Sequence, residues 1–194
     1  MKKLALNMLV INVLLLLQYG CTSNQLPPTD PLNRITALAE ESLPQIKEID
    51  KKGAKTVGSK DIQTIQELLR EKLAIEKLTE DKLKKIVDNE YNKEILFEQE
   101  GNKDKFVIKK ITFKNASLQD SEITINLQAE IETIADLSSN VEGIIVDTNG
   151  IEIHKEKFFP EEEKSHGIKA GEHVTLYCNL SASNVSNFSK IIVR

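Results

Sequence analysis

The sequence predicts an α+β protein, with an N-terminal helical segment over residues 31–100 followed by an antiparallel, immunoglobulin-like β-sandwich over residues 104–194. Two observations lead to this prediction. Apolar residues recur every three to four positions before Gly101 and every second position after it, which are the periods of helices and strands. Polar turn residues then divide the second part into short segments, a pattern typical of a β-sandwich.

The first helix is expected to begin at Asp30-Pro31, because aspartate at the N-cap and proline at the first helical position are a favoured pair. Its apolar face would consist of Ile35, Leu38, Ala39, Ser42, Ile46 and Ile49. Pro44 lies within this run and predicts either a kink or a division into two shorter helices.

Two further helices are expected before the sheet. Residues 51–60 contain two glycines and four lysines and predict a flexible connection. A second helix should span 61–77, and Thr79, followed by two acidic residues, should begin a third that ends near Gly101. The apolar stripes on these helices indicate core or inter-helix packing, and a groove for a partner helix is the alternative.

Six strands are expected after Gly101. The clearest spans residues 122–132, in which isoleucine, leucine and alanine alternate with polar residues, as in a strand with one wet face. The Asn149-Gly150 pair predicts a tight hairpin. The other five strands are expected at 106–114, 141–147, 151–157, 172–180 and 190–193.

Residues 1–20 have the features of a secretion signal. Lys2 and Lys3 precede a mostly apolar stretch, 4–17, which as a helix would be about 21 Å long, short of the roughly 30 Å hydrocarbon core. A cleaved signal peptide is therefore predicted rather than a membrane-spanning helix. Gly20-Cys21 resembles the end of bacterial lipoprotein signals, which implies that the Cys21 thiol receives diacylglycerol. An ordinary secretion signal is the alternative.

The mature chain would begin at Cys21, and residues 21–30 would form a tether that is stiffened by Pro27-Pro28. Without Lys2 and Lys3 the 26 basic residues become 24 against 30 acidic ones, a net charge of −6. This balance argues against nucleic-acid binding, which depends on neutralising phosphates with basic side chains. An acidic chain is also repelled by anionic lipid headgroups, so membrane attachment is expected through the acyl chains. If the cell is Gram-negative, a threonine and not an aspartate at position 22, directly after the cysteine, resembles the pattern of lipoproteins sorted to the outer membrane. The protein is then expected to face the periplasm, and exposure at the cell surface is left open.

Part of the C-terminal region resembles a known family. The segments Val146–His154 and Ala170–Tyr177 contain an Asp-x-x-Gly hairpin followed by a Val-Thr-Leu-Tyr strand. Together, over about residues 141–194, they resemble the YcfL-like family of small outer-membrane lipoproteins. The resemblance implies a fold and a cellular location. It implies no active site, because the family has no established enzymatic activity.

No residues form a convincing catalytic or metal-binding pattern, and neither a cofactor nor a metal is expected. The three histidines, His154, His166 and His173, are not placed to converge on an ion with the neighbouring glutamates. Cys178 alternates with apolar residues and is expected in the core. No serine lies in a nucleophile turn, and no glycine-rich loop suits phosphate.

The candidate partner-binding residues are Phe158, Phe159 and Tyr177. The two phenylalanines precede an acidic run, 161–163, in a chain with few aromatic residues, and such side chains can anchor a partner. The alternative is that one phenylalanine caps the core while the glutamates are solvated. Tyr177 lies on the wet face of its predicted strand, which could receive either a partner or the helical segment.

These features together favour a non-enzymatic bacterial envelope lipoprotein, anchored through Cys21, whose β-sandwich binds another envelope protein. A surface-exposed adhesin or ligand-binding lipoprotein is the second hypothesis. A weak enzyme acting on the cell wall is the third.

Overall fold

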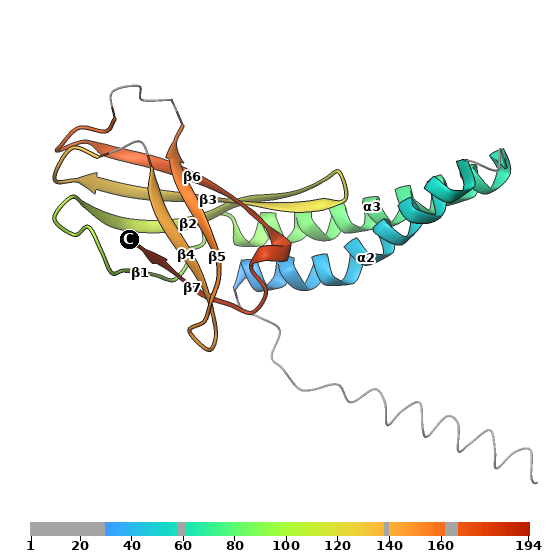
Figure 1. Ribbon diagram of the computed structural model, residues 1–194, viewed down its shortest axis with the longest axis horizontal. Coiled ribbons are helices and arrows are strands. Elements are labelled where there is room, and N and C mark those ends of the chain that lie inside the picture. Colours follow the sequence, from blue (N-terminus) through green and yellow to red (C-terminus); the bar gives the residue numbers. More distant parts are fainter. Residues whose placement is uncertain (1–29, 58–60, 138–139, 162–166) are drawn as a thin grey trace, which may run out of the picture.

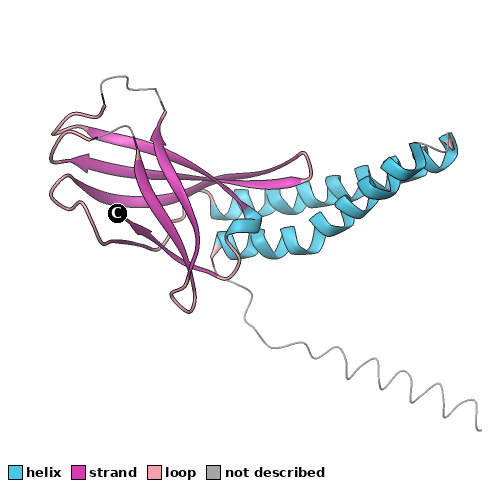
Figure 2. Ribbon diagram, viewed as in Figure 1, coloured by secondary structure: helices cyan, strands magenta, loops and turns pink. Residues whose placement is uncertain are grey.

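The computed structural model describes residues 30–57, 61–137, 140–161 and 167–194, which form two long helices and one curled seven-stranded sheet (Figures 1 and 2). The α+β class is therefore confirmed. The elements are α2 (Pro31–Val57), α3 (Ile62–Glu90), β1 (Phe97–Gln99), β2 (Phe106–Gln119), β3 (Glu122–Thr133), β4 (Val141–Asp147), β5 (Glu152–Pro160), β6 (His173–Ser181), the short 3-10 helix η1 (Ala182–Asn184) and β7 (Phe188–Val193).

Helix α2 begins at Pro31 as expected, but it continues through Pro44 to Val57, so the division into two shorter helices is wrong. Pro44 lies on the exposed side of the helix. Because proline has no amide hydrogen, the backbone carbonyl four residues earlier lacks its helical donor, and water can hydrogen-bond to it instead. The neighbouring Leu43 and Ile46 are buried against the rest of the protein. This packing supports the helix where the proline weakens it, since most helical stability in proteins comes from tertiary contacts.

Helix α3 is a single helix where two were expected. Its start is confirmed at Asp61, whose carboxylate caps the helix by accepting a bond from the Thr64 amide at 3.2 Å. The expected new start at Thr79 is wrong, because Thr79 is buried mid-helix and its hydroxyl donates to the Ile75 carbonyl at 2.8 Å. The helix ends at Glu90, and β1 lies where a third helix was expected to end.

All six expected strands are present, and β4 has the predicted bounds. The sheet has the order β1-β7-β4-β5-β6-β3-β2, and its pairs are antiparallel except for the parallel pair β1–β7. The predicted tight turn joins β4 to β5. There Gly150 has a φ of +77°, and the Asp147 carboxylate accepts bonds from the Asn149 and Ile151 amides, each at 2.8 Å.

The finer prediction of an immunoglobulin-like sandwich is not confirmed, because the strands join into one sheet instead of two facing ones. β5 pairs with β4 along its length but with β6 only at its end, through Phe159 and Pro160. The sheet also curls until its edges approach each other. The Ile95 amide donates to the Ile111 carbonyl of β2 at 2.8 Å, in the segment that leads into β1.

The helices and the sheet share one hydrophobic core. Residues of α2 and α3 and the inward side chains of β2, β3 and β6 belong to the same buried cluster. The first turns of α2 are also bonded to the C-terminal part of the chain: Asn33 donates to the Phe188 carbonyl at 2.8 Å. Among the described residues, no helix combines the length and apolarity that a bilayer span requires.

Candidate binding surfaces

Several residues singled out from the sequence lie outside the described residues. These are Cys21, the expected lipid-attachment site, together with Glu162, Glu163 and His166 of the acidic loop. Lipid attachment at Cys21 therefore stays a prediction.

The side chains of the two phenylalanines of the candidate partner surface lie on opposite faces of the sheet. Phe158 points inward and is only 1% exposed, so its expected role in partner binding is wrong. Its ring packs so close to Gly143 of β4 that an added Cβ there would lie 2.8 Å from a ring carbon. Phe159 points outward and is 48% exposed, because successive residues of a strand face opposite sides.

Phe159 and Tyr177 are brought together. They are directly opposite each other where β5 meets β6, which makes them a cross-strand pair on the outer face of the sheet. The Tyr177 hydroxyl donates a hydrogen bond to Glu161 at 3.2 Å. Partial burial, and then the negative charge of Glu161, raise the pKa of the tyrosine hydroxyl. The pair forms a small aromatic surface beside an acidic group.

Among the described residues, His154, His173 and Cys178 do not assemble a reactive site. His154 lies 3.3 Å from Glu156, and His173 is exposed on β6. The described part of the chain contains no group of histidine, cysteine and acidic side chains that could hold a metal ion. Cys178 is buried in the core as expected, and this burial raises the pKa of its thiol.

A larger candidate surface lies on the helical hairpin, where α2 and α3 extend beyond the sheet (Figure 1). Here the two helices enclose an open hollow of about 230 Å³, which we call the distal groove. Its lining is mostly apolar and consists of Ile49, Asp50, Gly53, Ala54, Val57, Ile65, Leu68, Leu69 and Lys72. The helical stripes in the sequence indicated packing faces, but nothing in them showed where that packing stops.

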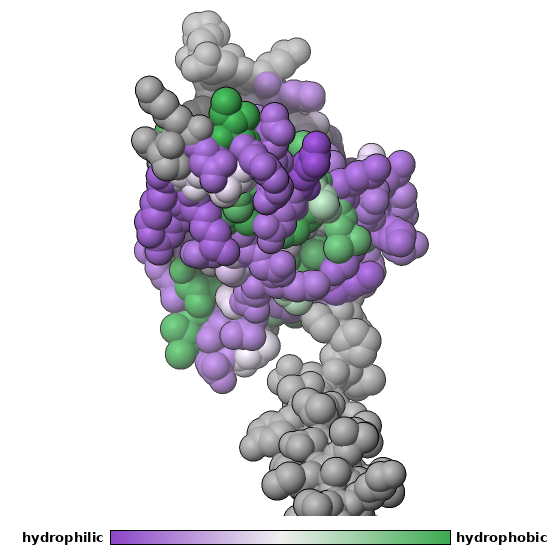
Figure 3. All heavy atoms as spheres, turned by 90° about the vertical axis from the view of Figure 1, so that its right-hand side faces the viewer, coloured by the Kyte–Doolittle hydropathy of each residue, from purple (hydrophilic) through white to green (hydrophobic). Residues whose placement is uncertain are grey.

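The distal groove continues a face that is covered nearer the sheet. On α3, Leu83 and Val87 line a hollow of about 260 Å³ together with residues 115–118 of β2. Towards the start of the same helix, Leu69 and Leu73 lie on the same side at helical spacing, but they are 54% and 63% exposed. Figure 3 looks onto this end of the molecule and shows hydrophobic patches between hydrophilic residues.

The boundary between the covered and the open part lies at Asp50 of α2. Its carboxylate accepts bonds from Lys72 of α3 at 2.6 Å and from Ser121, in the β2–β3 turn, at 3.1 Å. The bond from Lys72 is the main reason that the pKa of Asp50 is lowered. Lys72 also lies 3.7 Å from Glu76, so these two acidic groups beside the groove share one cation.

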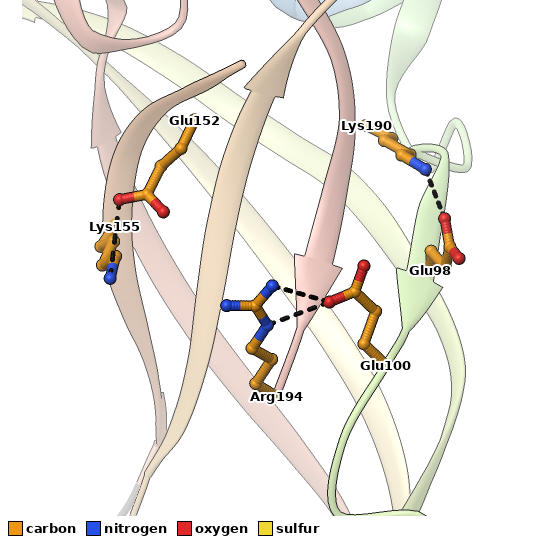
Figure 4. Close-up of polar contacts among 6 residues, drawn as sticks. All are labelled: Glu98, Glu100, Glu152, Lys155, Lys190 and Arg194. Atoms are coloured by element: carbon orange, nitrogen blue, oxygen red, sulfur yellow. Dashed lines mark hydrogen bonds and ion pairs between the residues drawn. The ribbon is translucent and has the colours of Figure 1, made fainter. Parts of the chain in front are cut away.

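The outer face near the C-terminus carries a set of ion pairs (Figure 4). Arg194 donates two bonds to Glu100 at 2.7 and 3.0 Å, and Lys190 of β7 pairs with Glu98 of β1. Exposed pairs of this kind contribute about 0–1 kcal/mol each. They connect β1 and the segment after it to the end of the chain, which is a structural role.

Comparisons with known proteins found no relative: no protein-family model matches the chain, and neither a curated protein nor a solved structure matches it.

Proposed function

We propose that this chain is a non-enzymatic bacterial envelope lipoprotein that is anchored through Cys21 and binds another envelope protein. The observation that carries the binding role is the helical hairpin, whose distal groove exposes Leu69 on a face that β2 covers elsewhere, with Leu73 exposed one turn further along the same side. Exposed apolar patches of this kind mark interaction sites in soluble domains. The Phe159–Tyr177 pair supplies a second, smaller contact surface.

The signal-like residues 1–20 and the Gly20-Cys21 pair support the proposed anchor. The resemblance of residues 141–194 to YcfL-like lipoproteins supports an outer-membrane location facing the periplasm. An immunoglobulin-like relationship of the sheet is part of the same proposal and rests on the strand pattern of the sequence.

The anchor is tested by replacing Cys21 with alanine in the full chain and separating membranes from soluble proteins. The variant is expected in the soluble fraction, because its acyl chains cannot be attached. Membrane association equal to that of the parent chain would rule the lipid anchor out.

The binding role is tested by placing a photoreactive amino acid at Leu69 in the producing cell. Crosslinks to another envelope protein are expected from this position. Leu78 is the matched control, because it lies on the same helix and is 57% exposed. Its side chain points roughly 180° away from that of Leu69 around the helix axis. Equal crosslinking from both positions, or none from Leu69, would contradict the proposed role of the hairpin.

A surface-exposed adhesin or ligand-binding lipoprotein is the second candidate, favoured by the aromatic pair of exposed Phe159 and half-buried Tyr177 on the outer face of the sheet. Protease treatment of intact cells distinguishes the two. The periplasmic protein survives the treatment, whereas the surface-exposed one is degraded.

A further inference from the structure

We infer that the distal groove binds an acidic amphipathic helix of the partner protein, and this inference rests on the proposed protein-binding function. The argument uses the shape of the groove, the apolar character of its floor and the charges on its two rims.

The groove has the dimensions of a site for a short helix. It runs from Ile49 to Val57 on α2 and from Ile65 to Lys72 on α3, lengths of about 12 and 11 Å. About two turns of a third helix fit this length, and the furrow between two packed helices suits the ridge of another. Recognition of this type depends on apolar anchors spaced three or four residues apart.

The floor of the groove provides the apolar contacts. Gly53 and Ala54 of α2 have small side chains or none, and an added Cβ at Gly53 would meet nothing within 4 Å. Leu69 of α3 lines the groove, and Leu73 follows it one turn later on the same side. The partner helix would therefore cover both leucines in the way that β2 covers Leu83 and Val87.

Both rims of the groove are basic. On α2, Lys47 and Lys51 are exposed and precede Asp50 and Ala54 by three residues, which places them along one edge. On α3, Arg70 and Lys77 are exposed three and four residues from Leu73, along the other edge. Within the described part of the chain, none of these four cations takes part in an ion pair.

The acidic groups near the groove do not cancel this charge. Asp50 and Glu76 share the single cation Lys72, so these three groups leave one negative charge against the four cations of the rims. Glu80 lies about two turns closer to the sheet, where it lines the hollow next to β2. A helix with carboxylates on both sides of an apolar stripe is therefore the complementary partner.

Other occupants fit less well. Two copies of the chain facing groove to groove would bring their basic rims together. A flat bilayer surface would contact the outer edges of the helices and leave the floor of the groove open.

The test measures binding of two labelled peptides to the purified chain by fluorescence anisotropy. Both peptides have leucines at positions i, i+3, i+7 and i+10 of a helix, and they differ only in carrying glutamates or lysines on the flanks. We expect the acidic peptide to bind at least about tenfold more tightly than the basic one. Added salt should reduce this preference, because the rims are exposed.

Variants of the groove make the test specific. The double substitution L69Q/L73Q should weaken binding of the acidic peptide at least about tenfold, while the control L78Q leaves it unchanged. The double substitution K51E/R70E should reverse the preference in favour of the basic peptide. All these positions are exposed, so the fold is retained, which unfolding curves of each variant verify.

Each contrary outcome has a definite meaning. The inference is overturned if neither peptide binds or if L78Q weakens binding as much as L69Q/L73Q. It is also overturned if L69Q/L73Q leaves peptide binding intact but abolishes self-association, measured by sedimentation, or binding to phosphatidylglycerol vesicles. Crosslinks from Leu69 to another protein, with no peptide binding, would reject the acidic helix and leave the proposed function standing. If Leu69 gives no crosslinks and no peptide binds, both the proposed binding function and the acidic helix are rejected.

Discussion

Ser121 in the β2–β3 turn donates a hydrogen bond to Asp50, about two turns before the end of α2, at 3.1 Å and across a separation of 71 residues. This contact marks the end of the β2–β3 hairpin on the helices. On the sheet side of it the apolar faces of α2 and α3 are covered, and beyond it they are open. The position of this one turn therefore determines how much of the helical hairpin is available to a partner.

The adjacent phenylalanines should respond in opposite ways to truncation. Phe158→Ala should lower the free energy of unfolding by about 3–5 kcal/mol, because it removes a fully buried ring from the core. Phe159→Ala, one residue further, should lower it by about 1 kcal/mol or less, because it removes only the cross-strand contact with Tyr177. Urea unfolding of both variants measures this difference, and equal losses would contradict the inward and outward assignment.

Gly143 should not tolerate a side chain. Gly143→Ala places a Cβ 2.8 Å from a ring carbon of Phe158 and 3.3 Å from Ile191, so it should cost about 1–3 kcal/mol of stability. The control is Gly53→Ala in α2, where the added Cβ meets nothing within 4 Å and the helix should gain roughly 0.5–1 kcal/mol. Thermal unfolding compares the two, and a stabilising effect at Gly143 would refute the close contact.

The Asp50–Lys72 contact should contribute to stability in a pH-dependent way. The pKa of Asp50 is lowered in the folded state, so its contribution is present above the unfolded pKa of about 3.9 and is lost as the pH falls through the folded value. Asp50→Asn should therefore cost up to about 1 kcal/mol at pH 7 and less at about pH 2. Denaturant unfolding at both pH values checks this, and an equal cost at both would disprove the ionic contribution.

Cys178 should be unreactive while the protein is folded. It is buried, and burial raises the pKa of its thiol, so little thiolate is exposed to a reagent. In a Cys21→Ala background, a thiol reagent should label Cys178 slowly under native conditions and completely in denaturant. Fast native labelling would show that the strands around β6 open readily.

Local patterns in the sequence predicted much of the fold. The alternation in residues 122–132 predicted β3, and the Asn149-Gly150 pair predicted the β4–β5 turn, because each depends on neighbouring residues alone. The failures came from long-range contacts. Thr79 has the features of a helix start, but its burial keeps α3 continuous. β1 was missed because a three-residue strand depends on its pairing with β7.

The sequence by itself determined the α+β class, most strand positions and the burial of Cys178, because residue periodicity encodes which faces avoid water. Only the tertiary structure decided that the strands form one curled sheet and that Phe158 and Phe159 have different roles. It also decided where the helical hairpin stops being covered. β2 continues five residues beyond its predicted end at Lys114, and those residues cover α3 only up to the Asp50 contact. An apolar stripe looks the same in a sequence whether another part of the chain covers it or leaves it open.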